Sequence, residues 1–520
     1  MKDGAAVESL AKRWPRLPMR QHRERIVLSA TPAVLPELVA QLSAAEARLV
    51  GIVAERREVG LRLHYPFCSA PTGSWLVPEI DVEDGAEVPS VSHIVFSADW
   101  YEREIEDLFG VRFAGHPLLG DFVLHDEIWP EGVAPMRREF DALRPYARTP
   151  NPNYEPVQVV DAPGAFTMTV GPTYGGITES GQFLLETIGE EVIHTQPRLF
   201  YKYRGIEKIA EGRPADHLVL FAERLNGQAA FAHALACVQA LETLAATDVP
   251  PRARRLRVLW AELERLRSHT ATIAGIGKST GLSVPTNLLY SLVEELLRLS
   301  GAYAGHRYLF GLVRPGGLTC DLGDHDAAAL ASSVDGLARR LQSIATSLRF
   351  DSSFLDRLEE VGAIEPEEAL RYGLVGPIAR ASASQHDLRI AVPYADYSAL
   401  APTVPSEQEG DGYARLRIFV AEALESARLV REAATALPGG PAATDWMPAE
   451  GAAIGWSEAP AGTACHFVRL DSMGRALRYR LMPPAFTNWH AFHLAAENFA
   501  FQDFPITLAS VGLNVAESDR

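Results

Sequence analysis

The four cysteines are the residues most able to hold a metal ion or an iron-sulfur cluster, and their spacing argues against both. Cys68, Cys237, Cys320 and Cys465 lie 169, 83 and 145 residues apart along the chain. Zinc and cluster sites are typically built from closely spaced pairs such as CxxC, and the chain contains no such pair. The sequence therefore predicts four buried, reduced thiols and no metal held by this chain.

A second candidate for chemistry is the densely charged segment YEREIEDLFG at residues 101–110. Charges at this density usually form the solvated face of a helix, although they also suit a docking surface. Residues 92–97, SHIVFS, are predicted as a strand that leads into this helix. Trp100, Ile105 and Leu108 are predicted to share its apolar face.

The elements that must position these residues fall into two parts. Residues 25–65 alternate short apolar segments with one helical segment, a βαββ pattern typical of an α+β domain. Proline and tyrosine accumulate in RPYARTPNPNYEPV, which is the strongest linker signal in the chain. We therefore predict a domain of residues 1–155 and a second of residues 156–520.

The second part begins with an apolar, glycine-rich stretch at residues 163–193 that predicts a β-hairpin. Apolar residues then recur at helical spacing over 217–246, 253–275 and 284–300, which predicts three long helices. The predicted fold class is α+β, with a helical bundle and a small sheet after the boundary.

Composition narrows the classes of function. The chain has 520 residues, 47% of them hydrophobic and 22% charged, as expected of a globular protein. Its formal net charge of −17 repels phosphate backbones, so we predict no nucleic-acid partner. No apolar stretch resembles a signal peptide or a membrane span, so membrane attachment is expected through another subunit.

The chain resembles two families. YEREIEDLFG, followed by GHP at 115–117, resembles the 30-kilodalton subunit of respiratory complex I. From Gly171 onward the chain resembles the 49-kilodalton subunit of complex I and the large subunit of energy-converting nickel-iron hydrogenases. The segments that carry this second resemblance are YRGIEK at 203–208, FAH at 231–233, RPGG at 314–317, GPIARAS at 376–382, EAP at 458–460 and PAFTNW at 484–489, together with Glu262, Arg265 and His269.

The resemblance implies a fused subunit with an α+β domain like the 30-kilodalton subunit, followed by a helical bundle like the 49-kilodalton subunit and the hydrogenase large subunit. Fusion of both parts, together with the segments HRYLFGLVRPGGL and PPAFTNW, favours the formate hydrogenlyase and hydrogenase-4 type. In the family of the 30-kilodalton subunit, the segment that matches residues 101–110 docks against neighbouring subunits, which implies an interface role for its charges.

The hydrogenase relatives hold nickel through two pairs of cysteines, because nickel in this setting requires soft sulfur ligands. The positions that match these thiolates hold Asn226, Ala229, Asn514 and Glu517. Since none of these residues carries sulfur, we predict that the chain binds no nickel and activates no hydrogen.

The complex I relatives place a tyrosine, an aspartate and a histidine around the quinone head group. The matching positions here are Gly227, Asn226 and Thr178, so this triad is not carried over either.

Three titratable groups remain around the position of the lost ligands, and Tyr174 stands where the family often has a histidine. Glu179 lies on the sheet loop, His233 lies one turn beyond the lost ligands, and the guanidinium of Arg224 is expected to face the pocket. These groups are candidates for a proton relay. The alternative is that they are ordinary structural residues.

Charged residues within otherwise apolar helices form a further set. They are expected to pair internally, because a buried charge is costly without a partner, and proton coupling to a membrane arm is the alternative. The set comprises Arg204, Glu207, Glu262, Arg265, Arg314 and Arg380.

Two hypotheses for function follow from the resemblance. In the first, the chain is an oxidoreductase subunit that passes electrons from an iron-sulfur partner to an unidentified acceptor, with a quinone as a candidate, coupled to ion translocation. In the second, it is a redox-silent structural subunit that transmits changes to a membrane arm. Both imply no cofactor held by this chain, an iron-sulfur small subunit like the 20-kilodalton subunit of complex I, antiporter-like membrane subunits, and a place on the cytoplasmic face of the inner membrane.

Overall fold

The computed structural model describes all 520 residues except 1–13, 15–16, 23–24, 148–157, 175–178 and 498. The domain boundary expected near residue 155 lies outside the described residues. The chain divides into two compact units. Unit 1 comprises residues 1–157, 198–203 and 371–373, and unit 2 comprises 158–197, 204–370 and 374–520.

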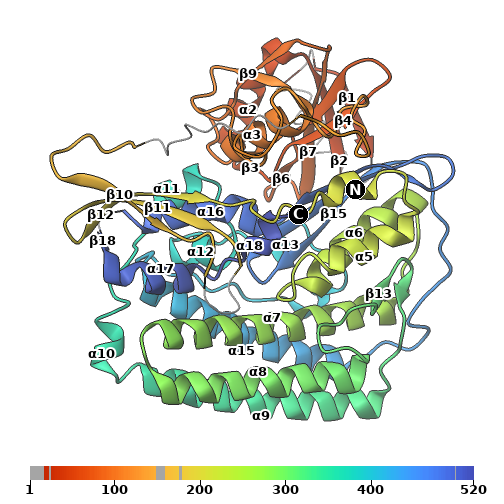
Figure 1. Cartoon of the computed structure of the whole chain (residues 1–520). Coiled ribbons are helices and arrows are strands. Elements are labelled where there is room, and N and C mark those ends of the chain that lie inside the picture. Colours follow the sequence, from red (N-terminus) through yellow and green to blue (C-terminus); the bar gives the residue numbers. More distant parts are fainter. Residues whose placement is uncertain (1–13, 15–16, 23–24, 148–157, 175–178, 498) are drawn as a thin grey trace. The chain divides into compact units, whose positions relative to one another are not determined.

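Unit 1 is built on one mixed sheet with the strand order β1-β2-β7-β5-β4, to which β6 is added beside β7 and β3 beside β6 (Figure 1). β2 and β7 run parallel and the other pairs are antiparallel. The strands are β1 (Met19–His22), β2 (Arg25–Ala30), β3 (Ala47–Leu49), β4 (Val53–Arg56), β5 (Leu61–His64), β6 (Phe67–Ser69) and β7 (Ser74–Val82), with a separate parallel pair β8 (Glu87–Pro89) and β9 (Arg112–Ala114). The short helix η1 (Pro32–Val34) precedes α2 (Leu35–Ala44), and α3 spans Ala98–Phe109.

Helix α3 contains the charged segment, and the residues before it differ from expectation. Residues 92–97 do not form the predicted strand, because the backbone there turns, with Ile94 and Val95 both donating to the Val91 carbonyl. Within the helix, Trp100, Ile105 and Leu108 are buried, as predicted.

Two of the charged residues of α3 form hydrogen bonds within unit 1. Glu102 is fully buried and accepts from the Ser90 hydroxyl and the Val91 amide, and burial raises its pKa to about 7. Asp107 accepts from the amides of Val123 and Leu124.

Unit 2 contains two main sheets and a bundle of long helices. The first sheet has the order β10-β11-β12-β18, and β10 pairs antiparallel with β11, which confirms the predicted hairpin. The second sheet is an antiparallel three-stranded meander, β15-β16-β17. The strands are β10 (Ala165–Val170), β11 (Gln182–Ile188), β12 (Glu191–Arg198), β15 (Gly451–Ala459), β16 (Gly462–Leu470), β17 (Ala476–Met482) and β18 (Phe499–Ala500), with a small pair β13 (Val313–Arg314) and β14 (Gly317–Leu318).

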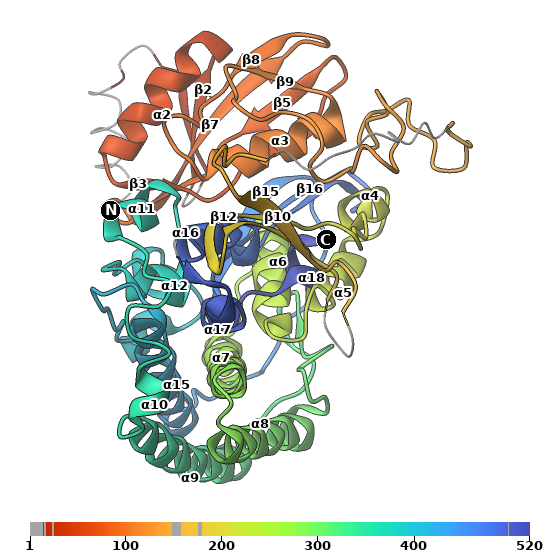
Figure 2. The ribbon, with the colours of Figure 1, turned by 60° about the vertical axis from the view of Figure 1, so that its left-hand side comes forward.

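The four longest helices pack side by side into a bundle, in which α7 contacts α8 and α15, and α9 contacts α8 and α15 (Figure 2). They are α7 (Pro251–Ser279), α8 (Ser283–Ala304), α9 (Asp324–Leu348) and α15 (Gly412–Thr435). The helices predicted over 253–275 and 284–300 correspond to α7 and α8. Together with the second sheet, this confirms the predicted bundle with a small sheet.

The helix predicted over 217–246 is wrong as a single element, because the chain forms α5 (Ala215–Glu223) and α6 (Ala230–Ala245) with a break between them. Helix α6 packs on β15 and β16. Its contact with β15 requires Gly455, since a Cβ there would lie 2.0 Å from the Ala236 carbonyl oxygen. The remaining helices are α4 (Ile206–Ala210), α10 (Ser352–Leu355), α11 (Pro366–Arg371), α12 (Gly376–Ala381), α13 (Leu388–Ala391), α14 (Tyr397–Leu400), α16 (Pro484–Ala495), η2 (Phe501–Asp503), α17 (Phe504–Val511) and α18 (Val515–Ser518).

Among the described residues, every helix is either too short or too polar to cross a lipid bilayer. Three of the four cysteines are buried as predicted, but Cys320 is exposed, because it follows the β13-β14 turn at the surface of unit 2.

Candidate functional site

The break between α5 and α6 places polar groups at the start of a buried helix. The side-chain oxygen of Asn226 accepts from the Ala229 amide at 2.7 Å. The next amides, of Phe231 and Ala232, donate to the carboxylate of Glu264 on α7 at 2.8 and 2.9 Å. An anion at this point satisfies amides that have no partner within the helix. Burial nevertheless raises the pKa of Glu264.

The final turn of the chain supplies the other half of the site. Asn514 caps α18 by accepting from the Glu517 amide at 3.2 Å. The Glu517 side chain is buried and accepts from the Asn226 amide group, from His233 Nε2 at 3.0 Å and from the Ala485 backbone amide at 3.0 Å. The structure therefore brings Asn226 and Glu517 into direct contact.

A line of hydrogen bonds continues from Glu517 into the core, and we call it the histidine chain: Glu517, His233, His466, Tyr479 and Cys237. His233 Nδ1 lies 3.1 Å from His466 Nε2, and His466 Nδ1 lies 2.9 Å from the Tyr479 hydroxyl. Tyr479 bonds in turn to the Cys237 thiol.

Burial decides the protonation of the inner end of this chain. It lowers the pKa of His466 well below its ordinary value, and the neighbouring His233 lowers it further. Burial also raises the pKa of the Cys237 thiol to about 12 and that of Tyr479 well above its ordinary range. His466, Tyr479 and Cys237 are therefore neutral groups, joined by hydrogen bonds and not by charge.

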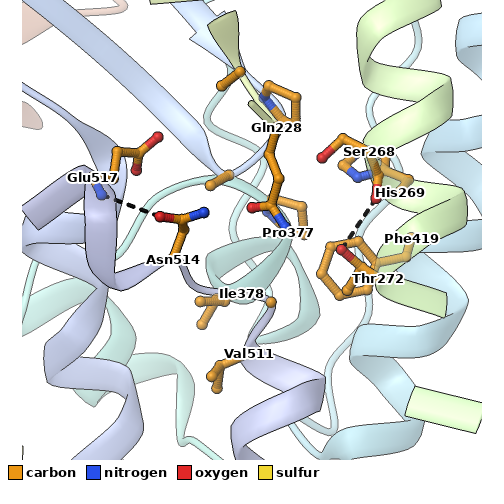
Figure 3. A pocket seen from close by; sticks show the side chains of 14 residues that line it. Gln228, Ser268, His269, Thr272, Pro377, Ile378, Phe419, Val511, Asn514 and Glu517 are labelled. Atoms are coloured by element: carbon orange, nitrogen blue, oxygen red, sulfur yellow. Dashed lines mark hydrogen bonds between the residues drawn. The ribbon is translucent and has the colours of Figure 1, made fainter. Parts of the chain in front are cut away.

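A small pocket opens beside Glu517 (Figure 3). Asn514 and Glu517 border it on one side, and Ser268, His269 and Thr272 of α7 border it on the other. The space that the centre of a water molecule can occupy is about 20 Å³, and one bound water needs roughly 10 to 15 Å³ on this measure. The pocket has room for one or two water molecules. Its full lining is Gln228, Ala229, Ser268, His269, Thr272, Pro377, Ile378, Phe419, Pro460, Ala461, Val511, Gly512, Asn514 and Glu517.

The residues at the positions expected to match the nickel ligands do not fit a nickel-iron centre. Nickel there needs thiolates, whereas Ala229 has no donor atom and the side chains of Asn226 and Glu517 are bonded to each other. Across the described residues, no three His, Cys, Asp or Glu side chains are arranged to hold a metal ion.

Of the other sequence candidates, Glu179 lies at the edge of this site. Glu179 is exposed and accepts from the Ala516 amide at 2.9 Å, so it touches the residue beside Glu517. Arg224 does not line the pocket. It is 56% exposed, pairs with Glu223, and its guanidinium lies 5.3 Å over the ring of Phe310. Thr178 lies outside the described residues, and Tyr174 donates to the Gly181 carbonyl.

A second buried cluster begins at His269 on the pocket wall, and we call it the charge network. His269 Nε2 lies 3.0 Å from Glu422, whose carboxylate binds Arg380 at 2.6 Å. Arg380 also binds Asp387 at 3.2 Å and Glu458 at 3.0 Å. The network comprises Glu262, Arg265, His269, Arg380, Asp387, Arg389, Glu422 and Glu458, all of them buried.

The pKa values within the charge network diverge. Arg380, His269 and Arg265 hold the pKa of Glu422 far below its usual range. Burial and the neighbouring Asp387 instead raise the pKa of Glu458 to about 7. Burial lowers the pKa of His269. Glu458 is therefore the carboxylate of this network that titrates near neutral pH.

The charged set expected to pair internally does so in part. Glu262 pairs with Arg265 and Arg389, and Glu207 binds Arg478 at 2.7 Å and Arg480 at 3.1 Å. Arg204 instead donates to the backbone carbonyls of Leu225, Ala516 and Asp519 and ties the α5-α6 break to the last turn. Arg314 is exposed and donates to the Leu318 carbonyl.

Sequence reasoning missed His466, Tyr479, Glu422, Asp387 and Arg389. Glu458 stood in the quoted EAP motif and carried the clearest available signal, a carboxylate inside an apolar strand. The others are joined to their partners only by the fold.

Comparison with known proteins covers both units. The family described as respiratory-chain NADH dehydrogenase, 30 Kd subunit, matches residues 29–146, and the 49 Kd subunit family matches residues 280–449 and 443–520. The family of nickel-dependent hydrogenases matches residues 204–272, which include the α5-α6 break.

Three relatives align over nearly the whole chain. Formate hydrogenlyase subunit 5 of Escherichia coli is 27% identical over 512 residues, covering 96% of this chain and 90% of the relative. Hydrogenase-4 component G of the same organism is 27% identical, covering 96% and 89%. The C/D subunit of NADH-quinone oxidoreductase from Bdellovibrio bacteriovorus is 25% identical over 502 residues, covering 89% of each.

These matches confirm the resemblance that the motifs indicated. The chain is a fusion, in one polypeptide, of parts like the 30-kilodalton and 49-kilodalton subunits of complex I, and it is related to formate hydrogenlyase subunit 5, hydrogenase-4 component G and the fused C/D subunits of NADH-quinone oxidoreductase.

Proposed function

We propose that this chain is a peripheral subunit of a membrane-bound assembly of the complex I and hydrogenase-4 type, in which it couples other parts without exchanging electrons itself. The observation that carries this proposal is that Asn226 and Glu517, at positions expected to match nickel ligands, hydrogen-bond to each other, and that Glu517 also hydrogen-bonds to His233. A site whose polar groups satisfy one another offers no open ligand for a redox centre.

The size of the pocket supports the same conclusion. Ligand pockets usually enclose roughly 300 to 1,000 Å³, whereas this one holds one or two water molecules. An organic acceptor such as a quinone would have to displace Glu517 or the α7 wall. The hypothesis of electron transfer to an acceptor at this position is therefore the weaker of the two.

The numbers of hydrogen-bond donors and acceptors support a role of the histidine chain in coupling. Ionised Glu517 only accepts, so His233 carries a proton on Nε2. If His233 is neutral, its Nδ1 accepts from His466 Nε2, and His466 Nδ1 accepts from the Tyr479 hydroxyl. If His233 is protonated on both nitrogens, His466 must carry its proton on Nδ1, and the Tyr479 hydroxyl turns to Cys237.

The two arrangements differ by one proton on His233 and by the tautomer of His466. Binding that proton beside the pocket thus reverses hydrogen bonds as far as Cys237 in the core. A response of this kind needs no redox centre, and it suits a subunit that transmits a change between neighbours.

The partners in this proposal come from the resemblance. An iron-sulfur small subunit like the 20-kilodalton subunit of complex I would hold any cluster, and antiporter-like membrane subunits would form the ion-translocating arm. The chain would lie on the cytoplasmic face of the inner membrane, attached through these partners.

The deciding experiment uses the assembly purified with its native partners. We expect no stoichiometric nickel in elemental analysis, and re-oxidation of the partner's reduced cluster by a soluble quinone should proceed equally with wild-type chain and with Glu517→Gln. Ion transport by the same variant should fall. Nickel at one atom per chain, or cluster re-oxidation that stops in Glu517→Gln, would instead establish electron exchange at this site.

The histidine chain can be tested in the full-length protein labelled with nitrogen-15 at histidine. Nuclear magnetic resonance distinguishes the two tautomers of a neutral imidazole. We expect His466 to remain neutral while its proton moves from Nε2 to Nδ1 as pH falls. A His466 tautomer that stays the same at every pH at which the chain remains folded would refute the coupled arrangement.

A further inference from the structure

A larger cavity lies in unit 2 between α9, α10 and α15, and it shares no lining residue with the pocket beside Glu517. The space open to the centre of a water molecule is about 230 Å³. A cavity of about 150 Å³ lined by apolar side chains is enough to hold a benzene molecule. This cavity can therefore accept a compact organic group.

The floor of the cavity is apolar. Leu416, Val420 and Leu424 follow one another at four-residue spacing along α15 and so line one face of that helix. Leu348 from the last turn of α9 and Phe354 from α10 add further apolar lining. Contact with hydrocarbon is the interaction that such a surface favours.

The rim of the cavity is polar and carries two arginines. The guanidinium of Arg417 lies 4.7 Å over the ring of Tyr413 and binds Glu407 at 2.8 Å and Glu409 at 2.6 Å. Its Nε is buried and has no hydrogen-bond acceptor among the described residues. Arg349, exposed at the end of α9, forms no ion pair with any described residue.

Arg349 is the cation on the rim that remains available to an anion. The single charge of Arg417 is shared by Glu407 and Glu409, whereas Arg349 has no carboxylate partner among the described residues. A buried N–H without an acceptor is unfavourable, and an acceptor from outside the chain would relieve it.

We propose that this cavity binds a small amphipathic carboxylate. Its hydrocarbon part lies on the floor formed by Leu416, Val420 and Leu424. Its carboxylate lies at the rim, where it accepts from the Nε–H of Arg417 and meets the guanidinium of Arg349. Nothing in this proposal depends on the site beside Glu517.

Three probes that differ only in the head group test the proposal on the full-length chain: octanoate, octanol and octylammonium. We expect octanoate to bind with a dissociation constant on the order of 1 mM in isothermal titration calorimetry. Octanol should bind several-fold more weakly, and octylammonium more weakly still. Equal binding of the three probes, or no binding of octanoate, would overturn the proposal.

Two variants with matched controls locate the binding. Ala421→Phe fills the cavity and should abolish octanoate binding, whereas Ala328→Phe adds the same ring at an exposed position of α9 and should not. Arg349→Gln should weaken octanoate binding about fivefold and leave octanol unchanged, whereas Arg339→Gln, also exposed on α9, should change neither.

Arg349 is exposed, so its variant is expected to fold, and thermal unfolding of each variant checks this. Octanoate that binds equally well to folded Ala421→Phe or Arg349→Gln would lie elsewhere and would refute the assignment.

Discussion

The two buried clusters of unit 2 show different ways to keep polar groups in a protein core. The histidine chain contains one carboxylate and no arginine, and its members are joined by hydrogen bonds. The charge network sets three arginines against four carboxylates. The first can rearrange by moving protons, whereas the second is fixed by charge.

The positions of the clusters sharpen this contrast. Glu517 and His269 face each other across the same small pocket, so each cluster reaches one wall of it. The charge network holds the bundle helix α15 to α7 and to the strand that carries Glu458. The histidine chain begins at Glu517, one of the positions that the resemblance matches to a nickel ligand. We infer that the charge network forms a rigid frame within which the histidine chain can rearrange its hydrogen bonds.

Removing Arg380 should have the largest effect. Arg380→Met leaves Glu422, Asp387 and Glu458 without their shared cation in a buried setting, which should lower the free energy of unfolding by about 3 to 5 kcal/mol. Urea denaturation measures this.

The control for Arg380 is Arg298→Met, which breaks the exposed helix pair with Glu294. It should cost less than about 1 kcal/mol. Equal losses in the two variants would mean that the charge network does not fix the bundle.

The next prediction separates two carboxylates bound to the same arginine. Glu422→Gln should lower the free energy of unfolding by about 3 kcal/mol at neutral pH, because Arg380 and His269 stabilise the ionised form of Glu422. Glu458→Gln should cost clearly less, because burial already favours the protonated form of Glu458, which glutamine resembles.

The pH dependence of stability tests the same pair. The pKa of Glu458 is raised from 4.5 to about 7, so the folded chain holds a proton that the unfolded chain releases between these values. The stability from this proton is present below pH 4.5 and is lost as pH rises through about 7. The thermal stability of the wild type should therefore fall as pH rises over this range, relative to the thermal stability of Glu458→Gln. Parallel pH profiles would contradict the raised pKa.

The extent to which the sequence predicts these clusters differs between them. Helical periodicity located α7 and α8, and family motifs located His233, Asn226 and Glu517. The break at 224–229 escaped the periodicity, because Leu220, Phe231 and Leu235 keep helical spacing on both sides of it. Only the hydrogen bond from the Ala229 amide to Asn226 and the anchoring of α6 by Glu264 show why the helix restarts.

The charge network was predictable only in part, for a different reason. Glu262 and Arg265 are three residues apart on α7, so their pairing could be inferred. Glu422 and Glu458 meet Arg380 from 42 and 78 residues away. Tertiary packing alone creates such contacts, and no local pattern in the sequence reports them.

Exchanging donor and acceptor in the contact between residues 226 and 517 tests the histidine chain. In Glu517→Gln, an amide group must replace either Oε1, which accepts from Asn226 and His233, or Oε2, which accepts from the Ala485 amide. The unsatisfied donors should lower the free energy of unfolding by about 1 to 3 kcal/mol.

Adding Asn226→Asp to this variant turns residue 226 into an acceptor for the glutamine amide. The double variant should therefore recover part of the loss, whereas Asn226→Asp alone should be destabilising because it places two carboxylates together. A double-mutant cycle measures this coupling. Strict additivity would mean that the contact between residues 226 and 517 does not organise the site.

The smallest effect on stability is expected at Glu179, at the outer edge of the site. Its side chain is exposed and accepts from the Ala516 amide, and glutamine keeps an oxygen for that bond. Glu179→Gln should therefore change the free energy of unfolding by less than about 0.5 kcal/mol. His233→Gln, in contrast, should destabilise the chain, because it interrupts bonds to both Glu517 and His466 in the core.

Ion transport by the assembled complex decides whether Glu179 also moves protons. If Glu179 delivers protons to the histidine chain, Glu179→Gln should reduce transport while assembly and stability stay normal, because only the titratable group is lost. Normal transport in a stable Glu179→Gln complex would remove Glu179 from the relay. It would leave His233 and Glu517 as a hydrogen-bonded pair without a proton donor at the edge of the site.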